Sequence, residues 1–189
     1  MNPAIDFLVR RFSISDKTKL LVGDYTTFLS IKKTKHLVQR NEICTCVYFI
    51  VKGYFIVYKY SEEGKLIIDW ILGPGDIMYA PESFRLQQVT GEAIQAITDA
   101  EVYYITHAQL AELEKDPEFK DIRIDLEVEY RGRGASDKEI RDLTKAEDRY
   151  ALFLKRYAHV VKYLSDKQIA AFIGVDPSTI AKIKGSSRK

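Results

Sequence analysis

The chain has 189 residues, of which 46% are hydrophobic and 30% are charged, and its formal net charge at pH 7 is +2. This length fits one or two small domains, and this composition is typical of a folded globular protein rather than a disordered one. No apolar run approaches the roughly 20 residues that a membrane span needs. The first residues lack a basic region followed by an apolar core, so we expect a cytoplasmic protein without a membrane partner.

The first half of the chain changes from a helical pattern to a β pattern near Phe28. Before Phe28, apolar residues recur every three or four positions, as they do on one face of a helix. Short runs rich in Val, Ile, Tyr and Phe then follow one another, separated by turns that contain Gly or Pro. We expect strands at 36–40, 47–51, 53–60, 65–72, 93–98 and 101–106. Consecutive strands without intervening helices favour an antiparallel sandwich or barrel.

After Thr106 the pattern becomes helical again. We expect a short helix over 108–115 and a second one that begins at Pro117, because Pro is tolerated in a first helical turn. The Arg-Gly-Arg-Gly sequence at 131–134 weakens this second helix, and Ser136 is a candidate restart. One face of the helix carries an apolar stripe that can form a dimer seam with a partner helix or pack on the chain's own β-domain. The stripe consists of Phe119, Ile122 and Leu126.

Two capping boxes mark the C-terminal part of the chain. In each, Ser or Thr is followed three residues later by Glu or Gln, which is a signal for the start of a helix. Thr144 begins the first box and Ser165 begins the second. Gly174 then ends a helix over 168–173, and Pro177 opens another over 178–184.

The last two of these helices match a helix-turn-helix. In this motif two helices joined by a tight turn pack on a third, with a small residue where they touch and Gly where the turn requires a positive φ. Ala170 and Gly174 fill these two positions. The apolar positions of the motif are also filled, by Ile169, Ile173, Val175, Ile180 and Ile183.

Charge also separates the C-terminal part from the rest of the chain. Residues 150–189 hold eight Lys or Arg and two Asp, a net charge of +6, whereas the remainder has a net charge of −4. A basic segment on an acidic body favours DNA as its partner, although a solvated basic tail would have the same composition. The second helix of a helix-turn-helix lies in the major groove. The expected DNA-binding residues are Ser178, Thr179, Lys182, Lys184, Arg188 and Lys189.

A single copy of this motif would recognise a particular DNA sequence only weakly. No Arg, Asn or Gln occupies its second helix to make a bidentate contact with a base. Two copies on a palindromic site would double the contacts, so we expect a homodimer. Six residues follow Ile183, and we therefore expect no β-hairpin wing after the motif.

Taken together, these features resemble the Crp/Fnr family of transcription regulators over essentially the whole chain. The resemblance is greatest to the branch with a degenerate nucleotide pocket and no wing. Its carriers are Val-Tyr-Phe-Ile-Val-Lys-Gly at 47–53, Glu-Glu-Gly-Lys at 62–65, Gly-Pro-Gly-Asp at 73–76, Ala-Glu-Asp-Arg-Tyr at 146–150 and Ile-Ala-Ala-Phe-Ile-Gly at 169–174.

The resemblance implies an α+β chain of three parts. These are a cyclic-nucleotide-binding-like antiparallel jelly roll over 1–115, a dimerisation helix over 116–143, and a DNA-binding helix-turn-helix over 144–189. It also implies that the partners are double-stranded DNA, a second copy of the chain, a small-molecule effector and RNA polymerase.

The resemblance fails in the ligand pocket. Family members that bind cyclic nucleotide carry a Gly-Glu-Leu segment for the ribose hydroxyl and, ten residues after its Glu, an Arg for the cyclic phosphate. In a gapless comparison Ala80 takes the place of the Glu and Thr90 that of the Arg, so the charge-assisted pair with a phosphate is lost. We expect a pocket that takes a less charged effector or is filled by its own side chains. The candidate pocket residues are Trp70, Tyr79, Phe84, Arg85, Thr90 and Glu92.

No feature of the sequence indicates an enzyme, a metal site or a cofactor. The three histidines are scattered, and Cys44 and Cys46 lie on one face of a strand-like stretch, where reduced thiols are expected. A phosphate-binding loop and a nucleophile elbow are both absent. The alternative to a DNA-binding regulator is a sensor or interaction module whose degenerate helix-turn-helix does not bind DNA specifically.

Overall fold

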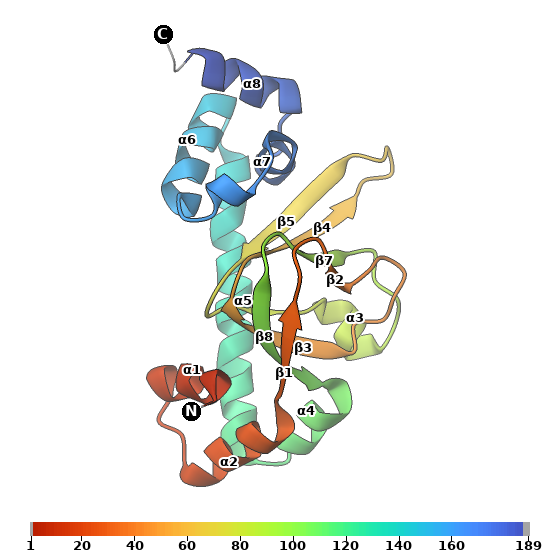
Figure 1. The fold of residues 1–189 in the computed structure, drawn as a ribbon, viewed down its shortest axis with the longest axis vertical. Coiled ribbons are helices and arrows are strands. Elements are labelled where there is room, and N and C mark those ends of the chain that lie inside the picture. Colours follow the sequence, from red (N-terminus) through yellow and green to blue (C-terminus); the bar gives the residue numbers. More distant parts are fainter. Residues whose placement is uncertain (1, 187–189) are drawn as a thin grey trace.

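The computed structural model describes residues 2–186, without the side chains at 131 and 133–136. Two sheets and several short helices lie along one long helix, α5, which carries a helical domain at its far end (Figure 1). The elements are α1 (Pro3–Arg11), α2 (Asp16–Tyr25), β1 (Thr27–Ile31), β2 (His36–Val38), β3 (Cys46–Lys52), β4 (Phe55–Tyr60), β5 (Leu66–Leu72), β6 (Ile77–Met78), α3 (Pro81–Leu86), β7 (Ala93–Ala96), β8 (Ala100–Thr106), α4 (His107–Leu113), α5 (Pro117–Asp142), α6 (Ala146–Tyr157), η1 (Val161–Tyr163), α7 (Asp166–Ile173) and α8 (Pro177–Ser186).

The strands form an antiparallel jelly roll of two four-stranded sheets, which confirms the expected fold class. One sheet has the order β1-β8-β3-β6 and the other the order β2-β7-β4-β5. Side chains alternate between the two faces of a strand, so Tyr48 and Ile50 of β3 enter the space between the sheets while Phe49 faces outward. Phe55, Leu72 and the other inward side chains fill this interior. The sequence patterns missed the strands β1 and β6 and the short helix α3.

Three short helices cover the outer face of the β1-β8-β3-β6 sheet. Helices α1, α2 and α4 pack there with the first half of α5, and Leu8, Val22 and Leu113 are buried between them. Phe119 and Ile122 of α5 belong to the same core and are 8% and 5% exposed. Leu126 packs against it and is half-buried.

The dimer seam expected at Phe119, Ile122 and Leu126 therefore requires correction. These side chains find their apolar partners within the chain, because the N-terminal helices fold over that face of α5. Among the large apolar side chains of α5 that the structure describes, Ile124 and Val128 stay exposed, at 44% and 65%.

Helix α5 is continuous from Pro117 to Asp142, so the two glycines do not end it and the candidate restart at Ser136 does not begin a new helix. Each interior Gly costs a helix only about 1 kcal/mol. Both ends of α5 are fixed by packing, at Phe119 against the N-terminal helices and at Ile140, which is 0% exposed, against the C-terminal domain. This burial outweighs the cost of the glycines.

Helix α6 begins at Ala146, and the capping box expected at Thr144 is not formed. The residue before the helix is Lys145, which makes no side-chain capping hydrogen bond. Arg149 instead ties the junction together: its Nε donates to the Leu143 carbonyl at 2.6 Å, and its Nη1 donates to the carbonyls of Ile173 and Gly174 at 3.3 and 3.1 Å. One guanidinium thus joins the end of α5 to the turn after α7.

The C-terminal helices pack directly on the jelly roll. The outer face of β4 and β5 contributes Ile56, Ile68 and Ile71 to a core that includes Phe153 of α6 and Phe172 of α7. Figure 1 shows the β4–β5 hairpin reaching toward α7. None of the helices in residues 2–186 is long and apolar enough to cross a membrane.

Candidate functional site

Helices α7 and α8 have the local signals that the sequence predicts. The Ser165 hydroxyl accepts a hydrogen bond from the Gln168 N–H at 3.2 Å, and the Gln168 side chain accepts one from the Ser165 N–H at 2.9 Å. Gly174 ends α7 at φ 72°, in the left-handed region that favours glycine. The carboxylate of Asp176 then accepts from the Ser178 N–H at 2.8 Å and opens α8. The capping box at Ser165 and the Gly174 turn are thereby confirmed.

The apolar positions of the motif form the contact between its helices. Ile169, Ala170 and Ile173 of α7 and Ile180 of α8 are at most 1% exposed, and Ile183 is 8% exposed. The face of α8 opposite this core carries Ser178, Ala181 and Lys182, which are exposed. This exposed face is the one that a helix-turn-helix presents to a major groove.

The expected DNA-binding residues differ in their surroundings. Ser178 and Lys182 are exposed, whereas Thr179 is half-buried. The ammonium of Lys184 pairs with the carboxylate of Asp166 in the first turn of α7, so part of its charge is already neutralised. No sequence pattern predicts this pair, because its members are 18 positions apart. Arg188 and Lys189 lie outside the described residues.

Ser178 also stabilises the start of α8. Its side chain and its backbone N–H lower the pKa of Asp176 below the ordinary value for aspartate. A carboxylate beside the N-terminus of a helix is favourable, because it accepts from N–H groups that have no partner within the helix. The Ser178 hydroxyl is thus shared between the helix cap and any ligand of the exposed face.

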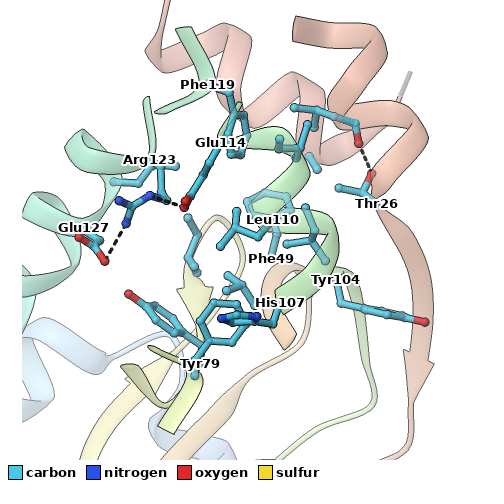
Figure 2. A pocket seen from close by; sticks show the side chains of 18 of the residues that line it. Thr26, Phe49, Tyr79, Tyr104, His107, Leu110, Glu114, Phe119, Arg123 and Glu127 are labelled. Atoms are coloured by element: carbon cyan, nitrogen blue, oxygen red, sulfur yellow. Dashed lines mark hydrogen bonds and ion pairs between the residues drawn. The ribbon is translucent and has the colours of Figure 1, made fainter. Parts of the chain in front are cut away.

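Three of the six residues expected to form an effector pocket line one cavity. Tyr79, Phe84 and Arg85 line a cavity of about 700 Å³ that lies outside the jelly roll (Figure 2). The ring of Trp70 instead stacks on Tyr130 of α5, with the ring centroids 4.6 Å apart. Thr90 is 7% exposed, and its backbone is hydrogen-bonded to the loop at residues 41–42.

The jelly-roll interior is filled in the region where a nucleotide was considered. Ala80 is 1% exposed and Phe84 6% exposed, and both belong to the core between the sheets together with Ile94. The Phe84 ring also meets the ring of Tyr79 edge to face, with the centroids 5.8 Å apart. Close-packed side chains thus occupy this part of the roll.

Glu92 is the acidic residue of the expected pocket. Burial raises the pKa of its carboxyl above the ordinary value of 4.5, and the nearby carboxylate of Asp69 raises it further. The folded protein therefore holds this proton more tightly than the unfolded chain does. As a result, the protein loses stability as the pH rises from about 4.5 through the raised pKa of the folded state.

Glu92→Gln is therefore expected to raise the melting temperature at pH 7, because the neutral amide avoids the cost of a half-buried negative charge. The gain should vanish below about pH 4, where the wild-type carboxyl is protonated in both the folded and the unfolded states. Thermal unfolding followed by circular dichroism at the two pH values measures this difference. The exposed Glu62→Gln is the control, and an equal gain in both variants at pH 7 would contradict the assignment.

The described part of the chain contains no candidate metal site. No group of three or more His, Cys, Asp or Glu side chains there could hold a metal ion. Cys44 and Cys46 are free and buried. Burial raises the pKa of the Cys44 thiol, which keeps it protonated and unreactive at neutral pH.

Comparisons with known proteins agree with this architecture. Residues 28–116 match the model of the cyclic nucleotide-binding domain family. No curated protein sequence matches the chain significantly.

Three solved structures are similar to the chain over most of its length. A transcriptional regulator of the Crp/Fnr family from Eubacterium rectale is 18% identical, with a TM-score of 0.77 over 97% of this chain and 88% of the other. The c-di-GMP-responsive global regulator CLP from Xanthomonas campestris is 11% identical, with a TM-score of 0.73 over 92% of each chain. A CRP/FNR-family transcriptional regulator from Thermus thermophilus is 16% identical, with a TM-score of 0.68 over 85% and 84%.

Residues 28–116 therefore form a domain of the cyclic nucleotide-binding type, and the chain as a whole has the fold of Crp/Fnr-family regulators. The resemblance seen in the sequence is confirmed at the level of the fold. At these identities the structural likeness defines the architecture, and the function must be argued from the site.

Proposed function

We propose that the protein is a DNA-binding transcriptional regulator. The observation that carries the proposal is the helix-turn-helix, with its capped helices, its buried contact and an exposed face on α8 that bears Lys182. The net charge of +6 on residues 150–189 supports it, because a polyanion is attracted to this end of the chain alone. The transcriptional regulators among the similar structures support the same role.

Lys182→Ala is expected to weaken binding to a DNA duplex and to flatten its salt dependence by about one unit of slope, because one phosphate contact is lost. Lys184→Ala should have the smaller effect of the two, since Asp166 already neutralises part of its charge. Thr179→Ala should alter mainly sequence preference. Fluorescence anisotropy over a range of salt concentrations, with random and with selected duplexes, measures all three variants.

Lys120→Ala on α5 is the matched control for these variants, because it removes an exposed positive charge from the body of the protein. Its affinity for DNA should remain that of the wild type. If Lys182→Ala behaves like this control, the helix-turn-helix does not bind DNA through α8. The protein would then be an interaction module.

The sensor part is proposed to respond to a small molecule other than a cyclic nucleotide. Ala80 and Thr90 supply no charge for a ribose and a cyclic phosphate, and Phe84 occupies space inside the roll. As a regulator of transcription, the protein would act together with RNA polymerase.

The active form is proposed to be a homodimer that pairs through the exposed face of α5. The two apolar side chains of that face, Ile124 and Val128, are one helical turn apart and can pack against their copies. Val128→Asp is expected to convert a dimer into a monomer at micromolar concentration, because it places two like charges in the seam. Sedimentation velocity measures the change, with Val9→Asp, at a residue 43% exposed on α1, as the control. A wild-type monomer, or an unaltered Val128→Asp dimer, would contradict this interface.

A further inference from the structure

A cavity of about 700 Å³ lies on the outer side of the jelly roll. Its floor is the outer face of the β1-β8-β3-β6 sheet, and its walls come from α1, α3, α4 and α5 (Figure 2). The cavity volume of about 700 Å³ is within the roughly 300–1,000 Å³ that small-molecule sites occupy. Phe84 lies at the boundary between this cavity and the filled interior between the two sheets, where the nucleotide pocket was expected.

The cavity wall is rich in aromatic rings that come from distant parts of the sequence. Such rings offer large apolar surfaces that stack on the faces and edges of other aromatic molecules. Phe7 and Phe49 contact each other with centroids 4.6 Å apart, and Phe84 meets the ring of His107 at 5.0 Å. The aromatic residues of the wall include Phe7, Phe49, Tyr79, Phe84, Tyr103 and Phe119.

The charged groups of the cavity wall do not favour an anion. Arg123 lies between two carboxylates, with its Nε 2.6 Å from Glu114 and its Nη1 3.0 Å from Glu127 (Figure 2). Glu82 and Arg85 are the other two charged side chains, so the five sum to a net charge of −1. A ligand that carries a full negative charge would be repelled by this field. The neutral form of the His107 imidazole offers a hydrogen-bonding group without a formal charge.

We propose that this cavity binds an uncharged aromatic small molecule. Its rings would lie among Phe7, Phe49 and Phe84, and a carbonyl or hydroxyl group would reach His107. The volume fits a molecule of two or three rings, and the net negative wall excludes phosphate, sulfonate and carboxylate ligands. The site does not depend on DNA binding, so it is tested without DNA.

The test compares two fluorescent probes that differ by one charged group. N-phenyl-1-naphthylamine is uncharged, and 8-anilino-1-naphthalenesulfonate has the same ring system with a sulfonate added. The uncharged probe is expected to bind the full chain saturably at one site, with a Kd on the order of 10 μM. The anionic probe should bind at least about tenfold more weakly, because of the net negative wall. Cyclic AMP should displace neither probe.

Two alanines of α4 provide a matched pair of variants. Ala111 lines the cavity and is exposed at its edge, whereas Ala108 is exposed on the same helix but does not line the cavity. Ala111→Phe should weaken binding of the uncharged probe by about tenfold by filling space, and Ala108→Phe should leave it unchanged. Glu82→Gln should strengthen binding of the anionic probe alone, by removing a negative charge.

Non-saturable binding of the uncharged probe would overturn the proposal. Equal or tighter binding of the anionic probe would overturn it as well, because the site would then favour anions. The same holds if Ala111→Phe and Ala108→Phe have equal effects, since the probe would then bind elsewhere. Weaker binding of the uncharged probe by Ala111→Phe, with an unchanged circular dichroism spectrum, supports the proposal. The unchanged spectrum shows that the variant is folded, so the loss of binding comes from the filled cavity.

Discussion

Phe172→Ala is expected to lower the free energy of unfolding by about 3–5 kcal/mol, the usual cost of removing a large aromatic side chain from a packed core. Phe172 is 0% exposed in α7, and its ring centroid is 5.6 Å from that of Phe153 and 5.1 Å from that of Tyr157. The guanidinium of Arg141 on α5 lies 5.9 Å from the same ring. One truncation therefore loosens α5, α6 and α7 together, and the cavity that it leaves cannot close without moving a helix.

Urea denaturation followed by far-ultraviolet circular dichroism measures this loss. Phe28→Ala is the matched control, because Phe28 is 51% exposed on β1 and loses far less contact when truncated. Similar midpoints for the two variants would contradict the assigned core. Unfolded Phe172→Ala would lose its affinity for DNA whatever the residue does in binding. DNA binding is therefore compared at a temperature at which both the variant and the wild type are folded.

Ile68→Ala is expected to lower the free energy of unfolding by about 2–5 kcal/mol, although Ile68 lies on the outer face of a sheet. The residue is 0% exposed because α7 packs on β5, and its carbonyl accepts a hydrogen bond from Arg141 Nη1 at 3.5 Å. The truncation removes contact from the core that the jelly roll shares with the helix-turn-helix. Both parts should therefore lose stability.

Two spectroscopic probes test whether the jelly roll and the C-terminal helices unfold together. The fluorescence of Trp70, the single tryptophan, reports on β5, and circular dichroism at 222 nm reports mostly on helices such as α5 to α8. Their unfolding transitions should coincide in the wild type and shift together in Ile68→Ala. Ile43→Ala, at a residue that is 42% exposed, should shift neither. A helical transition that separates from the tryptophan transition in the wild type would show that the shared core does not couple the two parts.

This shared core has a mechanical consequence for the regulator that we propose. Inward side chains of β5 such as Leu72 fill the roll, and outward ones such as Ile71 contact the helix-turn-helix. A change in the roll can therefore reach the C-terminal helices through a single strand. Helix α5 provides a second connection, from Phe119 among the N-terminal helices to Ile140 beneath the C-terminal ones.

Local signals in the sequence were sufficient to predict most of the helix-turn-helix. The Ser165 capping box, the Gly174 turn and the burial of Ile180 follow from hydrogen bonds and spacings within a few residues, and all three are present. The short β-rich runs separated by turns likewise predicted an antiparallel sandwich or barrel, and the resemblance to Crp/Fnr regulators narrowed it to the jelly roll that is present. The Thr144 box has the same pattern but does not form, and Arg149 joins that junction to the carbonyls of Ile173 and Gly174, which no local pattern predicts.

The sequence by itself thus determined the class of fold and the helix-turn-helix pattern at the C-terminal end. Only the tertiary structure decided which face of α5 is buried, where the cavity outside the jelly roll lies and which carboxylate pairs with Lys184. An apolar stripe such as Phe119 and Ile122 predicts that one face of the helix will be buried. It does not predict which other element of the chain, or which partner, will cover that face. The cavity is likewise assembled from side chains of α1, β3, α4 and α5, whose distances are set by packing between elements far apart in the chain.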